Sequence, residues 1–232
     1  FFIKITSTKM TNTLILDLLK NKKLFAFDFD GVIVDSVNIK TEAFAEIYKP
    51  YGQKIVDRVI NHHINNGGMS RFSKFKYYHN NYLNENIDEI EIESMSSKFS
   101  NIVVAKVISS QWIIGIIEFL NKLKLKKIDC VIISATPKKE LIQIVKARGI
   151  EKYFSLILGS PESKSSNLKH ALDIRGVTKE DTIFFGDAVA DWEASDKIGV
   201  QFVGVGDSIK NLLGEKKEGS YFIQNFKIFN EL

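Results

Sequence analysis

The chain has 232 residues, of which 44% are hydrophobic and 26% are charged, and its formal net charge is +4. This length suits one α/β domain, or one domain with an insertion, and the hydrophobic content is too high for a disordered chain. No uninterrupted apolar run reaches the roughly 18 residues that a membrane span needs. Nearly all of the basic residues are lysines, whereas arginine is the usual reader of phosphates and bases in nucleic acids. We therefore expect a globular protein that binds neither nucleic acid nor a membrane.

The chain begins at Phe1, and Met10 is its first methionine. The apolar residues before Met10 are too few for a signal peptide and lack a small-residue cleavage site, so we treat residues 1–9 as an appendage. Cys130 is the single cysteine, which excludes an internal disulfide and a cysteine-based zinc site. We expect it to be a small buried side chain in a strand, and we expect a cytoplasmic location.

Five short apolar runs, rich in β-branched and aromatic residues, predict strands that are buried on both faces. They lie at 24–29, 129–134, 156–158, 182–185 and 201–205. Helical patterns at 138–148, 165–175 and 188–198 separate the last four runs, and each is followed directly by glycine, as helix ends often are. This alternation predicts right-handed crossovers and hence an α/β fold with a doubly wound, Rossmann-like parallel sheet.

Residues 36–108 do not continue the alternation of strands and helices, because no short strand-like run occurs there. Apolar residues recur instead at helical spacing, in one stripe of Phe72, Phe75, Tyr78 and Tyr82 and a second of Ile92, Met95, Phe99, Ile102 and Val103. We interpret these stripes as the core of a small helical domain inserted after the first strand. The Rossmann-like core would then comprise residues 10–35 and 109–232.

Acidic residues follow the first and fourth predicted strands. Asp28 and Asp30 are two residues apart at a strand end, so their carboxylates would face the same way. Asp187 and Asp191 are four apart on an opening helical turn, and Asp187 alone would pass for a solvated loop acid. The carboxyl ends of parallel strands meet at one edge of a sheet. Several carboxylates without clustered histidines favour Mg²⁺ over zinc or iron.

Ser134 and Lys164 add the elements of a phosphate site. Ser134 ends the second predicted strand, just before the N–H groups that open the helix after Pro137. Lys164 follows the third predicted strand and would supply a positive charge. Neither residue is informative alone, and Lys152 and Lys169 are alternative candidates for the lysine of this site.

The segments DFDGVIVDS, VIISAT, Lys164 and GDAVAD resemble, in order and spacing, the four motifs of the haloacid dehalogenase superfamily. The resemblance spans residues 24–205, and the helical insertion lies where a C1-type cap lies in that family. It implies an aspartyl-phosphate mechanism with Asp28 as nucleophile and Asp30 as general acid and base. Mg²⁺ would be bound by the Asp28 carboxylate, the Asp30 backbone carbonyl and Asp187.

The resemblance also implies that Ser134 and Lys164 hold the phosphoryl oxygens, and that Asp191 supports the metal or orients Lys164. Gly31 and Val32 would offer backbone N–H groups to the same oxygens, and Ala135 is a further candidate for substrate contact. Dehalogenation in this family requires no acid at the position of Asp30. Asp30 therefore favours phosphate chemistry.

The expected function is that of a Mg²⁺-dependent phosphatase acting on a small phosphorylated metabolite, such as a sugar phosphate or phosphoglycolate. A phosphomutase of the same superfamily, and a binding protein without catalysis, are the alternatives. The segment SPESKSS lacks the KPxP pattern of many phosphoglycolate phosphatases and β-phosphoglucomutases, and GDAVAD lacks the acidic pair of many such mutases.

The helical insertion should select the substrate. Its candidates are His62, His63, Arg71 and Lys74, and Gly67-Gly68 could bring Arg71 over the site. A solvated helix face is nevertheless the favoured interpretation for each of these side chains.

Overall fold

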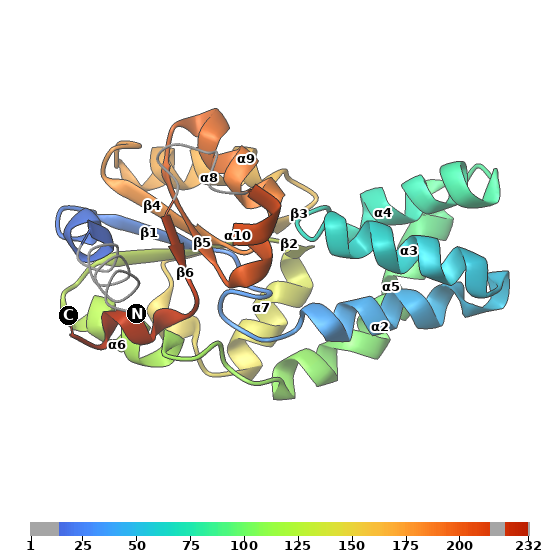
Figure 1. Ribbon diagram of the computed structural model, residues 1–232, viewed down its shortest axis with the longest axis horizontal. Helices are drawn as coiled ribbons and strands as arrows, with labels where there is room; N and C mark the ends of the chain where they lie inside the picture. Colours follow the sequence, from blue (N-terminus) through green and yellow to red (C-terminus); the bar gives the residue numbers. More distant parts are fainter. Residues whose placement is uncertain (1–13, 214–220, 232) are drawn as a thin grey trace, which may run out of the picture.

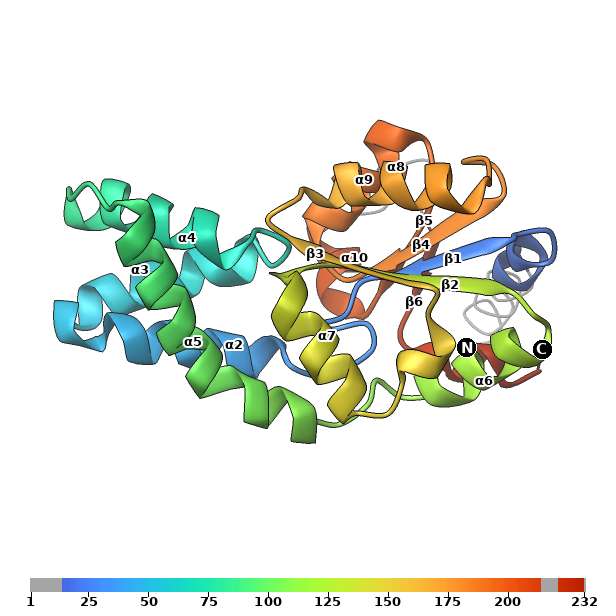
Figure 2. The ribbon, with the colours of Figure 1, turned by 180° about the vertical axis from the view of Figure 1, so that it is seen from behind.

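A six-stranded parallel sheet, in the order β3-β2-β1-β4-β5-β6, forms the centre of the molecule (Figures 1 and 2). The computed structural model describes residues 14–213 and 221–231. The strands are β1 (Leu24–Phe27), β2 (Asp129–Pro137), β3 (Leu156–Ser160), β4 (Thr182–Gly186), β5 (Gln201–Val205) and β6 (Tyr221–Ile223). The predicted parallel α/β fold is confirmed, and β6, on the edge beside β5, is an addition to it.

Helices connect the strands and make up the insertion. They are α2 (Val37–Tyr48), α3 (Gln53–Asn65), α4 (Arg71–Tyr78), α5 (Glu89–Ser109), α6 (Ile116–Leu125), α7 (Lys138–Ala147), α8 (Lys164–Arg175), α9 (Val189–Ile198) and α10 (Asp207–Leu213). Short 3₁₀ segments cover Lys49–Tyr51, Glu151–Tyr153 and Phe226–Glu231, and a π-helical turn covers His79–Leu83. None of the described helices is both long and apolar enough to cross a lipid bilayer.

Helices cover both faces of the sheet, as the continuous apolar strands require. Leu24 and Ala26 of β1 face α8 and α9, whereas Phe25 and Phe27 pack in the larger core below α6. Phe119 of α6 contacts both phenylalanine rings edge-on, with centroids 6.1 and 6.3 Å away. Figure 2 shows α8 and α9 on one side of the sheet and α6 and α7 on the other. Cys130 is buried in β2, as predicted.

Helices α2–α5 form an arm that extends to one side of the sheet (Figure 1). The predicted stripes are confirmed as part of its core except for Phe72 and Ile92. Phe44 packs there against Phe75 and Phe99 with ring centroids 5.5 and 4.6 Å apart. All three rings are buried. The helical insertion after β1 is therefore confirmed, while its predicted limits at residues 36 and 108 stay a prediction. The appendage assigned to residues 1–9 lies outside the described residues.

Candidate active site

Five of the predicted site residues come together at the carboxyl edge of the sheet. Asp28 follows β1 directly, Ser134 lies in β2 and Lys164 is the first residue of α8. Asp187 follows β4, and Asp191 lies in the first turn of α9. All of them except the fully buried Asp191 line a cavity of ≈ 580 Å³, which residues of the arm also line. They are thus neighbours in space, and their chemical roles remain predictions.

Lys164 is the buried cation of this cluster. Its Nζ donates to Asp28 Oδ2 at 2.8 Å and to Asp191 Oδ1 at 2.5 Å. Burial alone would lower the pKa of Lys164, but the Asp191 and Asp28 carboxylates more than offset this effect and raise it above its usual value. Asp191 Oδ2 also accepts from the Ala188 backbone N–H at 3.1 Å, which ties the start of α9 to the site. Asp191 therefore positions Lys164 against Asp28.

The carboxylates outnumber this cation. Oxygen atoms of Asp28, Asp187 and Asp191 lie within 4.8 Å of one another. Burial raises the pKa of Asp28 to about 7 against the opposing effect of Lys164, with Asp191 and Asp30 adding to the rise. Burial also raises the pKa of Asp187 well above its usual value, and Asp28 adds to that effect.

Asp187 lies within salt-bridge distance of no lysine or arginine among the described residues. Asp28 and Asp191 are buried and Asp187 is half-buried, so like charges gathered in this number call for a further positive charge. The atoms available as metal ligands are carboxylate oxygens, which are the ligands that Mg²⁺ prefers. This cluster therefore fits the predicted magnesium ion, which Asp28, Asp187 and Asp191 would hold.

The Asp30 carboxylate lies outside this acidic cluster and is held by its own partners. Oδ1 accepts from Ser36 Oγ at 2.6 Å, and Oδ2 accepts from Thr136 Oγ1 at 3.0 Å and from the Lys40 ammonium. Burial alone would raise the pKa of Asp30, but Lys40 and these hydrogen bonds lower it. The predicted metal contact through the Asp30 backbone carbonyl stays a prediction.

Lys40 and Thr136 are site residues that the sequence reasoning missed. Lys40 Nζ also donates to Thr136 Oγ1 at 2.8 Å, so the two side chains form one network on Asp30. Thr136 lies two residues after Ser134, and strand alternation would have placed both side chains on the same side. Lys40 gave no comparable signal, because it is one of many lysines on a helical pattern.

The other residues predicted to contact the phosphate or the substrate differ in their surroundings. Ser134 is buried, and its Oγ accepts from the Thr136 backbone N–H at 3.1 Å. Gly31 and Ala135 line the cavity. The Gly31 N–H, however, donates to the Val34 carbonyl at 2.8 Å, and Val32 is fully buried away from the cavity lining. Phosphate contacts from Gly31 and Val32 remain predictions.

The arm presents buried polar side chains to the same cavity. His63, Arg71 and Lys74 line it, with exposed fractions of 5%, 5% and 1%. The interpretation of these three as a solvated helix face is therefore wrong, because they lie on the same helix faces as the buried apolar residues of α3 and α4. His62 is half-buried outside the cavity lining, where it stacks on Tyr77 with ring centroids 4.3 Å apart.

The loop between α3 and α4 lies close to the carboxyl edge of the sheet. A Cβ on Gly68 would lie 2.5 Å from the Ala190 Cβ, and one on Gly67 would lie 3.5 Å from that of Ala188. This contact fits the expectation that the two glycines bring the arm over the site.

Arg71 joins the arm to the core. Its guanidinium donates from Nη1 to Glu140 Oε2 at 2.8 Å and from Nη2 to Glu140 Oε1 at 2.5 Å. Ser100 of α5 accepts from Arg71 Nη1 at 2.8 Å, and the Phe99 ring lies beneath the guanidinium at 4.4 Å. The charge of Arg71 is therefore already paired with α7, and its predicted contact with substrate remains a prediction.

Replacing Glu140 with glutamine should destabilise the protein measurably. Breaking one half of a buried ion pair typically costs about 3–5 kcal/mol, because the other charge stays buried. We expect urea unfolding to show that Glu140→Gln lowers the free energy of unfolding by an amount near the lower end of that range.

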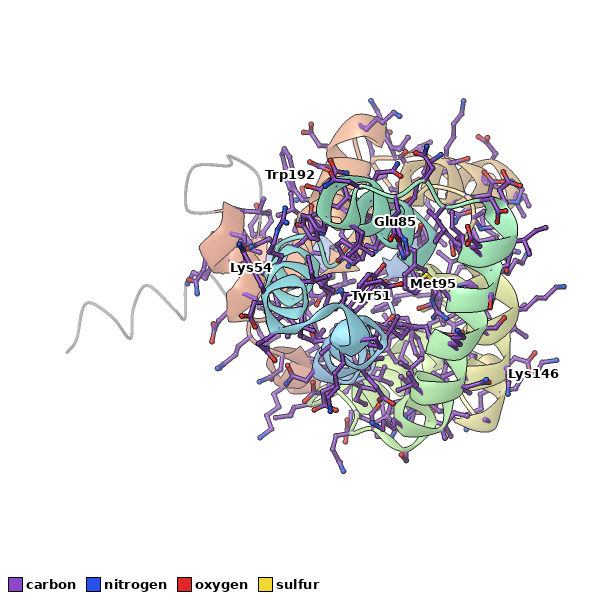
Figure 3. The ribbon with its side chains drawn as sticks, turned by 90° about the vertical axis from the view of Figure 1, so that its right-hand side faces the viewer. Tyr51, Lys54, Glu85, Met95, Lys146 and Trp192 are labelled. Atoms are coloured by element: carbon purple, nitrogen blue, oxygen red, sulfur yellow. The ribbon has the colours of Figure 1, made fainter. Side chains whose placement is uncertain are left out.

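Glu151→Gln is the matched control for this substitution. The Glu151 pair with Lys146 is 3.8 Å long and more than half exposed, and Lys146 projects away from the molecule (Figure 3). Its loss should change the free energy of unfolding by less than about 1 kcal/mol. Equal effects of the two substitutions would contradict a stabilising role for the Arg71–Glu140 pair.

The comparisons with known proteins identify the class to which this fold and site belong. The family described as haloacid dehalogenase-like hydrolases matches residues 25–205, so the chain belongs to that family and the predicted resemblance is confirmed. Phosphoglycolate phosphatase 1 of Pseudomonas aeruginosa is 24% identical over 185 residues, covering 77% of this chain and 67% of that protein.

Solved structures show the same fold. The β-phosphoglucomutase of Clostridium difficile has a TM-score of 0.73 and 21% identity, covering 88% of this chain and 92% of that one. A predicted phosphoglycolate phosphatase from Haemophilus somnus has a TM-score of 0.69 and 19% identity, covering 90% and 96%. At these identities the likeness extends to the fold alone.

Proposed function

We propose that this protein is a Mg²⁺-dependent phosphatase that hydrolyses a small phosphomonoester through an aspartyl-phosphate on Asp28. The observation that carries the proposal is the buried cluster in which Lys164 bridges Asp28 and Asp191 while Asp187 has no cation partner among the described residues. A nucleophilic carboxylate, a fixed ammonium and an excess of acids suit the transfer of a phosphoryl group.

In the first step, an Asp28 carboxylate oxygen bonds to phosphorus while the bond from phosphorus to the ester oxygen breaks. Asp30 gives its proton to the departing oxygen, so the alcohol leaves neutral. Lys164 and Ser134 hold the phosphoryl oxygens during this exchange. Mg²⁺, when held by Asp28, Asp187, the Asp30 carbonyl and the supporting Asp191, supplies positive charge against the phosphoryl group.

In the second step, Asp30 takes a proton from water, and the water oxygen attacks phosphorus to release inorganic phosphate and regenerate Asp28. The Lys40 ammonium lowers the pKa of Asp30 and so favours the unprotonated form that this step needs. The first step needs the protonated form, so the entering substrate must weaken the contact between Lys40 and Asp30.

Phosphate release from a panel of small phosphomonoesters tests the proposal. We expect release in the presence of Mg²⁺ and its loss in EDTA, because the acidic cluster would then lack its balancing charge. The panel includes a hexose 1-phosphate, whose products are identified. Free phosphate supports the phosphatase, whereas an isomerised hexose phosphate would replace it with the phosphomutase. No turnover of any ester with Mg²⁺ would contradict the proposal.

A further inference from the structure

Lys74 and His63 form a polar patch on the arm side of the cavity, across from the acidic cluster. Both side chains are buried, and both line the same cavity as Asp28 and Lys164. The loop that joins their helices, α3 and α4, reaches toward the carboxyl ends of the strands in Figures 1 and 2. A molecule bound at Asp28 would therefore extend toward this patch.

Within the described part of the chain, four cations line the cavity, and three of them have acidic partners. Lys164 pairs with Asp28 and Asp191, Lys40 pairs with Asp30, and Arg71 pairs with Glu140; the fourth cation is Lys74.

Lys74 has no carboxylate within salt-bridge distance among the residues that the structure describes. Its Nζ lies 2.7 Å from His63 Nδ1 and 5.5 Å from the centre of the Phe44 ring. Neither neighbour supplies a negative charge.

His63 is neutral in this arrangement. An ammonium can only donate, so His63 Nδ1 accepts from Lys74 and the ring proton lies on Nε2. Burial, and then the charge of Lys74, lower the pKa of His63 to about 2. His63 therefore fixes the direction of the Lys74 ammonium without balancing its charge.

The charge of Lys74 is poorly compensated in the protein alone. Burial lowers the pKa of Lys74 to about 7, and the nearby Lys40 and Lys164 act in the same direction, against a smaller opposing effect of Asp30. A purely structural side chain at this position would be more stable as an apolar residue, since a buried unpaired charge is costly. An anion in the cavity would supply the missing partner.

We propose that Lys74, positioned by His63, binds a second acidic group of the substrate, so that the substrate is a phosphomonoester that also carries a carboxylate or another phosphate. This inference rests on the proposed function, because it takes the ester phosphate to bind at Asp28. The cavity of ≈ 580 Å³ lies within the range of about 300–1,000 Å³ that small-molecule sites occupy. It has room for a short carbon chain that carries both groups.

Binding to Asp28→Asn tests the proposal without turnover. Calorimetry with Mg²⁺ compares three matched pairs of esters that differ mainly in the second acidic group. The pairs are phosphoglycolate with 2-hydroxyethyl phosphate, 3-phosphoglycerate with glycerol 1-phosphate, and fructose 1,6-bisphosphate with fructose 6-phosphate. We expect the acidic member of at least one pair to bind more tightly by at least about tenfold, as a charge-assisted hydrogen bond allows.

Lys74→Met, added to Asp28→Asn, should reduce this preference to less than about threefold, because methionine fills the same space without a charge. Lys74→Arg should retain part of the preference. Lys76→Met is the matched control, since Lys76 is an exposed lysine on the same helix, and it should keep the full preference. Thermal unfolding establishes that each variant is folded.

The absence of a preference in all three pairs would overturn the inference, as would a preference that survives Lys74→Met in a folded variant. Neither result would bear on hydrolysis itself. Failure of the proposed function would show separately, as the absence of phosphate release by the unmodified protein.

Discussion

Asp28→Asn should abolish phosphate release while leaving the fold intact. An amide is a far weaker nucleophile than a carboxylate, so no covalent phosphoryl intermediate can form at this position. The loss of a covalent nucleophile lowers kcat by several orders of magnitude, and we expect a fall of at least about a thousandfold here. Asparagine has nearly the same volume, so Lys164 keeps its contact with Asp191.

The same substitution should not destabilise the metal-free protein at neutral pH. The pKa of Asp28 rises from 3.8 to about 7, chiefly because of burial. The folded state therefore binds this proton more tightly than the unfolded chain, and the stability contributed by Asp28 falls as pH rises through that interval. Asparagine lacks this titration. In EDTA, the stability of Asp28→Asn relative to the unmodified protein should rise over the same interval.

Single-turnover phosphate release and urea unfolding at several pH values measure the two effects. Asp196→Asn is the control, because Asp196 is an exposed acid on α9, and it should change neither quantity. If Asp28→Asn retained more than about a tenth of the activity, the covalent route would be wrong. A catalytic role and a purely structural one differ here, because a structural acid would lose stability and activity together.

The arrangement of the acidic residues could be predicted because the topology is parallel. Phe27 of β1 is in register with Ile132 of β2 and with Phe185 of β4, so the residues that follow β1 and β4 share one edge. The ends of helices at glycine could be predicted equally well, since Gly176 and Gly199 adopt the left-handed conformation directly after α8 and α9. Both signals are local in the sequence. The parallel topology of the sheet then brings the residues that follow the strands together at one edge.

The burial of the cations on the arm could not be predicted in the same way. Helical periodicity shows which side chains share a face, but it does not show which second element covers that face. Arg71 and Lys74 share a face of α4 with the buried Phe75 and Tyr78. Arg71 is held there by Glu140 of α7, and no pattern in the sequence indicated that contact. Strand β6 was missed because three residues, Tyr221–Ile223, are too few to show alternation.

Gly31→Ala should disable the site through Asp187 and not through general instability. Gly31 has a φ of +78°, and a Cβ there would lie 2.0 Å from Asp187 Oδ2 and 2.5 Å from its Cγ. The left-handed conformation costs a residue with a Cβ about 1–2 kcal/mol, and the close contact adds the displacement of the half-buried Asp187 carboxylate. Because Asp187 belongs to the acidic cluster, we expect weaker Mg²⁺ dependence and a fall in kcat/KM of at least about a hundredfold.

Gly149→Ala separates the two causes, because Gly149 has a φ of +68° and nothing within 4 Å of its would-be Cβ. Backbone strain should cost Gly149→Ala about as much stability as it costs Gly31→Ala. Gly149→Ala should nevertheless have the same activity as the unmodified protein and reach half-maximal rate at the same Mg²⁺ concentration. Titration of the rate with Mg²⁺ in the three proteins decides the point. An unchanged Mg²⁺ requirement in folded Gly31→Ala would remove Asp187 from the metal site, since the Asp187 carboxylate could not keep its position with a carbon atom 2.0 Å from its Oδ2.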